Sequence, residues 1–405
     1  MRLLRKIWVL VLGVCASVWL GCGEPDTEIE ESYLHVWAGP RRPHDGLETP
    51  PGNDVLITVD LRTRRAVHVL DVGSANNEPH HMMRCGERLF AGGLFSGRVF
   101  VFDLATPERP ALEATLEGAE VGLGVADDFM CMQDGSVVAT MMGDAAGGSP
   151  GGMLRIDPDL TFHGILPQGA PEGCNPHGLD VDMERGLLVT TDLMELASVA
   201  SEPPAPAVRD TIRIWDADSL EVTDTVQVCC GPMEARFVPG DPDGRILVAC
   251  MADGAFGLVE PGADGKWGWR PLLDVDGADE LVAFPGITRL SPDGRTVWMA
   301  LSGYGEVRRY DIADPSGPVL EATATVGKGA HFMTFSDDGE RGYVSDYVVQ
   351  RLEAVTGMAP ADDKVWRFDT ATMKAEVILD VRDEGDDPLL AGRLPLQPHG
   401  LALHN

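Results

Sequence analysis

PDGRTVWMALSGYGEVRRYDIADP, residues 292–315, contains the pattern that decides the fold of this chain. It begins with the tight turn Pro292–Arg295, which leads into the apolar run VWMAL. A short loop follows, and the next run, VRRYD, ends in Asp311 before further turn-forming residues. Both runs are rich in the β-branched and apolar residues that suit a pleated sheet. The segment therefore predicts two strands with a tight turn at one end and an acidic hairpin at the other.

The same pattern recurs along the chain. Seven runs end in an acidic residue followed by a turn, and consecutive copies lie about 43 to 59 residues apart. They are LITVD (to Asp60), VFVFD (to Asp103), MLRID (to Asp157), IRIWD (to Asp216), FGLVE (to Glu260), VRRYD (to Asp311) and VWRFD (to Asp369). A second tight turn precedes most copies. Each unit therefore predicts one four-stranded blade, and the spacing indicates a β-propeller.

Six of these units are complete, and the seventh is divided between the two ends of the chain. PHGLALHN at 398–405 has the pattern of a lone inner strand, whereas Tyr33–Gly73 supplies the later strands that lack one. We therefore predict an all-β fold, a seven-bladed β-propeller over residues 33–405, whose ring is closed by N- and C-terminal strands. No segment keeps a 3.6-residue apolar period over four turns, so long helices are not expected.

The first residues have the pattern of an export signal. Three basic residues precede the apolar stretch Ile7–Leu20, and the chain then turns polar. Gly21–Cys22 resembles a bacterial lipoprotein processing site, so we predict a signal peptide over 1–21, a lipid on Cys22 and a tether over 22–32. Simple secretion is the alternative. A retained anchor is disfavoured because the stretch is shorter than the roughly 20 residues of a membrane span. The protein is then expected to be exported and lipid-anchored in the cell envelope, in the periplasm or on the outer surface.

The chain is strongly acidic, with 64 acidic against 32 basic side chains and a net charge of −32. Such a charge disfavours nucleic acid as a partner, and it disfavours attraction to anionic lipid headgroups. We therefore expect contact with a membrane only through the N-terminal lipid. The sequence identifies no partner protein and no oligomeric state.

Six cysteines follow Cys22, and they are Cys85, Cys131, Cys174, Cys229, Cys230 and Cys250. An exported location permits disulfides, and six cysteines allow 15 pairings among which the sequence does not choose. A propeller of this size does not need such cross-links for its core. We expect most of these cysteines to be small buried apolar side chains.

Five of the ten histidines occupy the same place in the repeat, near the start of the first strand of a unit. The first strand of every blade lines the central channel, so their side chains are expected to meet near its axis. These residues are His80, His81, His177, His331 and His399. Two other units place Asp127 with Met130, and Glu234, at this position. The other histidines fall in loops, late strands or the tail, where a solvated or structural role is expected; they are His35, His44, His68, His163 and His404.

A converging group of imidazoles is what a transition-metal site requires. Neutral imidazole suits copper, iron, nickel and zinc, while a soft sulfur such as the Met130 thioether favours copper. We therefore predict a copper site whose ligands come from the five channel histidines and Met130. The alternative is a structural role, in which the histidine of a PHG triplet hydrogen-bonds a neighbouring blade.

Over nearly its whole length after the signal, the chain resembles the selenium-binding proteins, a family that includes methanethiol oxidases. NEPHHMM followed by GGLFSGRVFVFDLATPERPAL is similar to the paired-histidine segment of that family and the strand after it. VVATMMGDAAGGSPGGMLRIDPDL is similar to the family's glycine loop, and LVAFPGITRLSPDGRTVWMALSGYGEVRRYDIADPSGP is the best match.

This resemblance implies an oxidoreductase that consumes methanethiol and dioxygen and releases formaldehyde, hydrogen sulfide and hydrogen peroxide, with copper held by channel histidines. His80 and His81 match the paired histidines of the family, and His399 matches the histidine near its C-terminus. A further family histidine, in blade two, is absent. Asp127, Phe129 and Met130 align across its place, so Met130, Asp127, His177 or His331 would have to restore ligation. Covalent selenium binding is not expected, because the cysteine pair of the family is reduced to Cys85.

We hypothesise that a small thiol binds the metal as its thiolate, since the thiolate is the form that ligates. The metal lowers the pKa of the thiol, and Glu234 or Asp127 takes the proton. Two other functions stay open. One is a non-catalytic surface module that binds a partner through long inserts at 199–209 and 356–363. The other is a lactone hydrolase on the same fold, which the histidine-rich channel disfavours.

Overall fold

The computed structural model describes residues 33–41, 52–168, 172–199, 206–276, 283–349, 359–382, 387–393 and 395–404. The predicted signal peptide, the lipid on Cys22 and the tether therefore lie outside the described residues. None of the helices within the ranges above is long and apolar enough to cross a membrane. The described chain contains one short α-helix, α1 (Leu196–Val199), and one 3-10 turn, η1 (Gly118–Val121).

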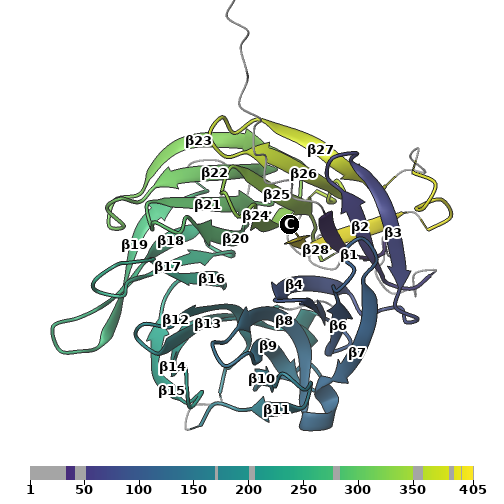
Figure 1. Cartoon of the computed structure of the whole chain (residues 1–405). Coiled ribbons are helices and arrows are strands. Elements are labelled where there is room, and N and C mark those ends of the chain that lie inside the picture. The colour runs from purple at the N-terminus through teal and green to yellow at the C-terminus, as the bar shows by residue number, and fades with distance from the viewer. Residues whose placement is uncertain are drawn as a thin grey trace, which may run out of the picture. The chain divides into compact units, whose positions relative to one another are not determined.

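Seven four-stranded sheets stand around a common axis as the blades of a propeller (Figure 1). In each sheet the strands run in chain order from the axis outward, apart from the sheet that holds both ends of the propeller. The first blade consists of β4 (Pro79–Cys85), β5 (Arg88–Gly93), β6 (Arg98–Asp103) and β7 (Ala111–Glu117), and the second of β8 (Leu123–Cys131), β9 (Val137–Asp144), β10 (Gly152–Ile156) and β11 (Phe162–Ile165). The third consists of β12 (Pro176–Asp182), β13 (Leu187–Glu195), β14 (Ala207–Asp216) and β15 (Val222–Gln227).

The remaining blades follow the same plan. The fourth consists of β16 (Pro232–Phe237), β17 (Ile246–Cys250), β18 (Ala255–Pro261) and β19 (Trp267–Asp274), and the fifth of β20 (Pro285–Leu290), β21 (Thr296–Leu301), β22 (Glu306–Asp311) and β23 (Val319–Thr325). The sixth consists of β24 (Ala330–Phe335), β25 (Arg341–Asp346), β26 (Lys364–Asp369) and β27 (Ala375–Asp380). The seventh has the order β28 (Leu396–His404), β1 (Tyr33–Pro40), β2 (Val55–Asp60) and β3 (Arg65–Asp71).

The seventh blade confirms the predicted closure of the ring. β28 pairs antiparallel with β1, from Tyr33 opposite His404 to Pro40 opposite Leu396. Trp37 of β1 then fixes this blade to the next one, because its ring contacts Phe100 and its indole N–H donates to the carbonyl of Gly92 at 2.8 Å. The two ends of the propeller thus share one sheet, and the inner edge of β1 is covered by its pairing with β28.

The repeated acidic residue has a structural cause. It ends the third strand of its blade, and in five blades its carboxylate accepts a hydrogen bond from a backbone N–H of the hairpin that follows; these residues are Asp60, Asp103, Asp216, Asp311 and Asp369. Asp and Asn side chains satisfy the free backbone donors of a turn in this way. The recurrence read from the sequence is therefore a repeated turn cap.

The cysteines differ from the sequence-based expectation. Four of the six form two disulfides, Cys85–Cys131 and Cys229–Cys250, whereas Cys174 is a buried free thiol and Cys230 an exposed one. The expectation was wrong for these four because partners 21 and 46 residues apart in sequence meet only when the strands are assembled. Of the six, Cys174 alone matches the small buried apolar side chain expected.

Candidate metal centre

Every inner strand of the propeller carries a β-bulge, and in all of them except β20 the bulge lies where the sequence placed candidate residues. Between β4 and β5, Pro79 pairs with Gly93 and Met82 pairs with Ala91. His80 and His81 therefore lie opposite one residue of β5. The other six inner strands show the same shift, at Ala126–Phe129, Pro176–Leu179, Pro232–Glu234, Pro285–Thr288, Ala330–Met333 and Pro398–Leu401. A bulge re-aims side chains that would otherwise alternate between the two faces of a sheet. Two successive residues, such as His80 and His81, can therefore both reach the channel.

The glycine of the PHG triplets follows from the close approach of neighbouring inner strands. A Cβ on Gly400 would lie 2.5 Å from the carbonyl oxygen of His80, and one on Gly178 would lie 2.7 Å from that of Met233. Contacts at this distance do not occur between real side chains and backbone, so only glycine fits after His399 and His177. In each triplet the histidine thus faces the channel, and the glycine allows the inner strand of the next blade to approach closely.

The structure brings together all five predicted histidines and Asp127. Two overlapping groups place one possible ligand atom per residue within 4.8 Å of one another, namely His80, His81, Asp127 and His177, and His81, His331 and His399. Asp127 lies at the centre of the first group. One of its oxygens is 3.0 Å from His81 Nδ1, and the other is 3.3 Å from His80 Nε2 and 3.4 Å from His177 Nε2.

These side chains are buried with polar atoms that lack hydrogen bonds. The atoms are His80 Nδ1, both ring nitrogens of His81, both oxygens of Asp127, His331 Nε2 and His399 Nε2. The Asp127 contacts are close, but their angles do not make hydrogen bonds. An unsatisfied buried polar atom costs about 1–3 kcal/mol. Here several unpaired nitrogen and oxygen atoms converge from four strands. A binding site for a cation requires such a group of free ligand atoms.

Two of the histidines are oriented by backbone carbonyls. His177 Nδ1 lies 2.9 Å from the Met233 oxygen, and His399 Nδ1 lies 3.2 Å from the Pro79 oxygen. A carbonyl can only accept, so Nδ1 is the protonated nitrogen of each ring and Nε2 is left free toward the cluster. Metal-binding histidines are commonly held through their second nitrogen in this way.

Without a bound cation, the histidines of the cluster differ in pKa. Burial lowers the pKa of His80 to about 4, although Asp127 opposes this. Burial also disfavours a proton on His81, but the Asp127 carboxylate outweighs it and raises the pKa of His81 to about 9. Burial and the neighbouring imidazoles keep the pKa of His331 and His399 well below the ordinary value. At neutral pH the metal-free cluster therefore holds neutral imidazoles around one Asp127–His81 ion pair.

A second polar layer lies beside the cluster and was largely missed from the sequence. Glu234 is fully buried in an ion pair with Arg236, and Arg236 also lies 3.5 Å from Asp128. Burial raises the pKa of Glu234 to about 7, although Arg236 opposes this. Arg289 of β20 lies 3.8 Å from the same carboxylate. Charged residues at inner-strand positions in MEARF and PGITRL were the available signal, because apolar residues would be expected there.

Met130 is placed apart from the histidines. It packs between blades against an apolar cluster that contains Val138, Leu179 and Trp215. The bulge in β8 directs Asp127 toward the histidines instead. Of the four residues expected to replace the missing family histidine, the structure therefore brings Asp127, His177 and His331 into the cluster and leaves Met130 outside it.

A small cavity adjoins the cluster. Four candidate ligands line it, namely His80, Asp127, His177 and His331. Most of its other lining is apolar, with the thioethers Met142, Met194, Met233 and Met251 beside Phe284. Tyr347 also lines it; its ring stacks on His399 at 3.7 Å, and its hydroxyl donates to Glu78 at 2.7 Å. The cavity suits a small apolar molecule that reaches the cluster with one reactive end.

Known proteins share the sequence pattern and the fold of this chain. The family model described as 56 kDa selenium binding protein (SBP56) matches residues 70–344. A methanethiol oxidase of Hyphomicrobium sp is 22% identical over 351 residues, 81% of this chain and 79% of that protein. A rat methanethiol oxidase is 25% identical over 336 residues, 72% of this chain and 70% of that protein. The X-ray structure of a hypothetical selenium-binding protein from Sulfolobus tokodaii superposes with a TM-score of 0.72 at 17% identity, over 92% of this chain and 93% of that one.

Proposed function

The chain belongs to the 56 kDa selenium-binding protein family, and from this membership we propose that it is a copper-dependent oxidase of small thiols. From the basic and apolar pattern of its first residues we propose that it is exported. The reaction would convert a small thiol, dioxygen and water into an aldehyde, hydrogen sulfide and hydrogen peroxide. The relatives named methanethiol oxidase support a small thiol as the substrate. The observation that carries the proposal is the buried cluster of five histidines and Asp127 with free nitrogen and oxygen atoms beside an apolar cavity.

The donor set fits a copper ion. Imidazole nitrogens are common copper ligands, and neutral rings are required for binding. The low pKa of His331 and His399 keeps those rings neutral, and their Nε2 atoms carry no hydrogen bond. Bound copper would supply the redox couple that passes electrons from the thiol to dioxygen. His80, His81, His177, His331, His399 and Asp127 are the residues that would hold it.

The side chains around the cavity would bind the thiol, exclude water and accept its proton. The apolar lining, with its methionines and Phe284, would hold the alkyl part of the thiol and exclude water from the cluster. Of the two carboxylates predicted as bases, Asp127 lines the cavity and Glu234 does not. Asp127 is therefore the group within reach of a thiol proton. Glu234, with a pKa of about 7, would exchange protons with the cluster from the layer beside it.

Elemental analysis of the purified protein, produced with its N-terminal segment and supplied with copper, tests the proposal. We compare the wild type with His80→Ala/His81→Ala and with the control His163→Ala, which removes an exposed histidine. About one copper per chain in the wild type and the control, lost in the double variant, supports a copper site; hydrogen peroxide release from methanethiol should follow the copper content. A folded wild type that binds no transition metal rejects the oxidase and favours a binding module.

Export is tested separately. Cell fractionation should find the protein in the envelope, and Cys22→Ala should release it into a soluble fraction if Cys22 carries the lipid. A protein that stays in the cytoplasm rejects this part of the proposal and leaves the metal site untouched.

A further inference from the structure

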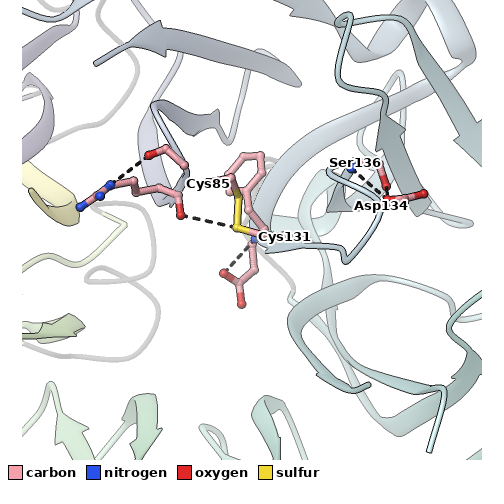
Figure 2. Close-up of a disulfide and its surroundings, with 8 residues drawn as sticks. Cys85, Cys131, Asp134 and Ser136 are labelled. Carbon is pink, nitrogen blue, oxygen red and sulfur yellow. Dashed lines mark hydrogen bonds between the residues drawn. A yellow bond between two sulfur atoms is a disulfide. The ribbon is translucent and has the colours of Figure 1, made fainter. Parts of the chain in front are cut away.

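Neighbouring inner strands of this propeller belong to separate sheets, so no backbone ladder joins them. Their spacing around the channel therefore depends on packing between the strands and on side chains that cross from blade to blade. Between β4 and β8 this link is covalent. The disulfide Cys85–Cys131 joins the last residue of β4 to the last residue of β8, with 5.7 Å between their Cα atoms (Figure 2).

The two joined strands are the ones that supply the most closely packed part of the candidate metal centre. His80 and His81 lie on β4 and Asp127 lies on β8, and 3.0 Å separates the Asp127 carboxylate from His81 Nδ1. Cys85 follows His81 by four residues, and Cys131 follows Asp127 by four. Four residues of strand span about 13 Å. The disulfide therefore lies about 13 Å beyond the candidate ligands, at the same distance along β4 as along β8.

The same strand end is tied on its other side. Arg84, the residue before Cys85, donates from Nη1 to the carbonyl of Leu403 at 3.1 Å. Leu403 lies on β28, four residues after His399. β4 is thus held between β28 through a charge-assisted hydrogen bond and β8 through the disulfide. These three strands carry His80, His81, Asp127 and His399.

We propose that Cys85 and Cys131 are positioning residues, whose disulfide sets the separation of β4 and β8 and thereby the affinity of the cluster for its metal. The inference rests on the proposed function, because it concerns the same metal centre. Ligand atoms must be held within a few tenths of an ångström for tight binding, and partners beyond the ligands commonly change metal affinity 10- to 100-fold. Opening the disulfide retains every candidate ligand residue, but the distance between β4 and β8 is then no longer fixed by a covalent bond.

The second disulfide provides a matched control. Cys250 ends β17, and Cys229 lies just before β16 of the same sheet, where Pro232 pairs with Cys250. This cross-link reinforces two strands that a backbone ladder already joins. Its loss should therefore affect stability without changing the separation of any two blades.

The experiment compares the wild type with Cys85→Ser/Cys131→Ser and with Cys229→Ser/Cys250→Ser, each as the full chain. Copper affinity is measured by competition with a chelator of known strength, and circular dichroism and the melting temperature show whether each variant is folded. We expect a copper affinity at least about 10-fold weaker for the first variant and within about twofold of the wild type for the second.

A second readout does not depend on metal. Diethyl pyrocarbonate, followed by mass spectrometry of the peptide that contains His80 and His81, should modify this peptide faster in the first variant than in the wild type or the control. If Cys85→Ser/Cys131→Ser does not fold, folded wild type is reduced briefly and alkylated. Molecules opened only at Cys85 and Cys131 are then assayed in the same way.

The outcomes separate this inference from the proposed function. Equal copper affinity in all three proteins, or an equal loss in both variants, overturns the positioning role while leaving the copper site established. A wild type without copper binding overturns the proposed function, and unchanged histidine reactivity in the opened form then overturns the positioning role as well.

Discussion

The ion pair between Asp127 and His81 makes the stability of the metal-free protein depend on pH between 7 and 9. Their nearest atoms are 3.0 Å apart, both side chains are fully buried, and the carboxylate raises the pKa of His81 to about 9 from an ordinary 6.5. The native state therefore keeps a proton that the unfolded chain releases above pH 6.5. A raised histidine pKa gives stability that is complete below pH 6.5 and is lost as the pH rises through about 9.

The size of the effect follows from these two pKa values. With one proton at stake, the free energy of unfolding should fall by about 2 kcal/mol between pH 7 and pH 9. Burial opposes a lowered pKa of Asp127, but His177, His80 and His81 together bring it well below its ordinary value; the His81 share belongs to the same interaction, so it is counted once. Asp127→Asn keeps the shape of the side chain and removes its charge, and His81 should then lose its proton near or below pH 6.5.

The assay is urea unfolding followed by tryptophan fluorescence, in the presence of a chelator, at several pH values from 7 to 9. The wild type should lose the expected stability over this range, Asp127→Asn should give a nearly flat curve, and His163→Gln should follow the wild type because its ring is exposed. Parallel curves for wild type and Asp127→Asn would refute the assignment of the proton to this pair.

Three further changes test other parts of the structure. Burial raises the pKa of Glu234 to about 7, so the native state keeps a proton there that the unfolded chain releases near pH 4.5. The free energy of unfolding of the wild type minus that of Glu234→Gln should therefore fall by about 2 to 3 kcal/mol between pH 4.5 and 7. A difference that stays constant over this range contradicts the prediction. Trp37→Phe removes the indole donor to the Gly92 carbonyl and should lower the free energy of unfolding by about 2 kcal/mol in urea titrations; a loss under about 0.5 kcal/mol would show that this contact is replaceable. A stop codon in place of Leu396 removes β28 and exposes the edge of β1, so size-exclusion chromatography should find aggregated protein, and a soluble monomer with unchanged melting temperature would exclude closure by β28 as a requirement.

Much of the fold could be predicted because each blade repeats a local pattern. The hairpin after Asp311 needs only the residues around it, since the carboxylate accepts from the N–H of Ala313, two residues on. Repetition at blade length then indicates a ring, and the unmatched strands at 33–73 and 398–405 predict how it closes. The histidines were found by the same reasoning, because equivalent positions of different blades must meet at the axis.

The details of the site depended on neighbours that are distant in sequence. The roles of Met130 and Asp127 could not be distinguished from the segment alone, because the bulge in β8 decides which of them faces the histidines. Arg236 and Asp128 were missed for a related reason. Their charges are acceptable in the channel because Arg236 meets the carboxylates of both Glu234 and Asp128 there.

The sequence by itself determined the all-β repeat, the number of blades, the closure of the ring and the strands that carry histidines, because these follow from short-range strand and turn preferences repeated along the chain. The tertiary structure alone decided which ligand atoms come within 4.8 Å, which nitrogens stay free, that Glu234 is paired with Arg236, and that Cys85 meets Cys131. These outcomes depend on the distance and angle between blades, which arise when the side chains between sheets pack together. No single segment of the chain contains that information.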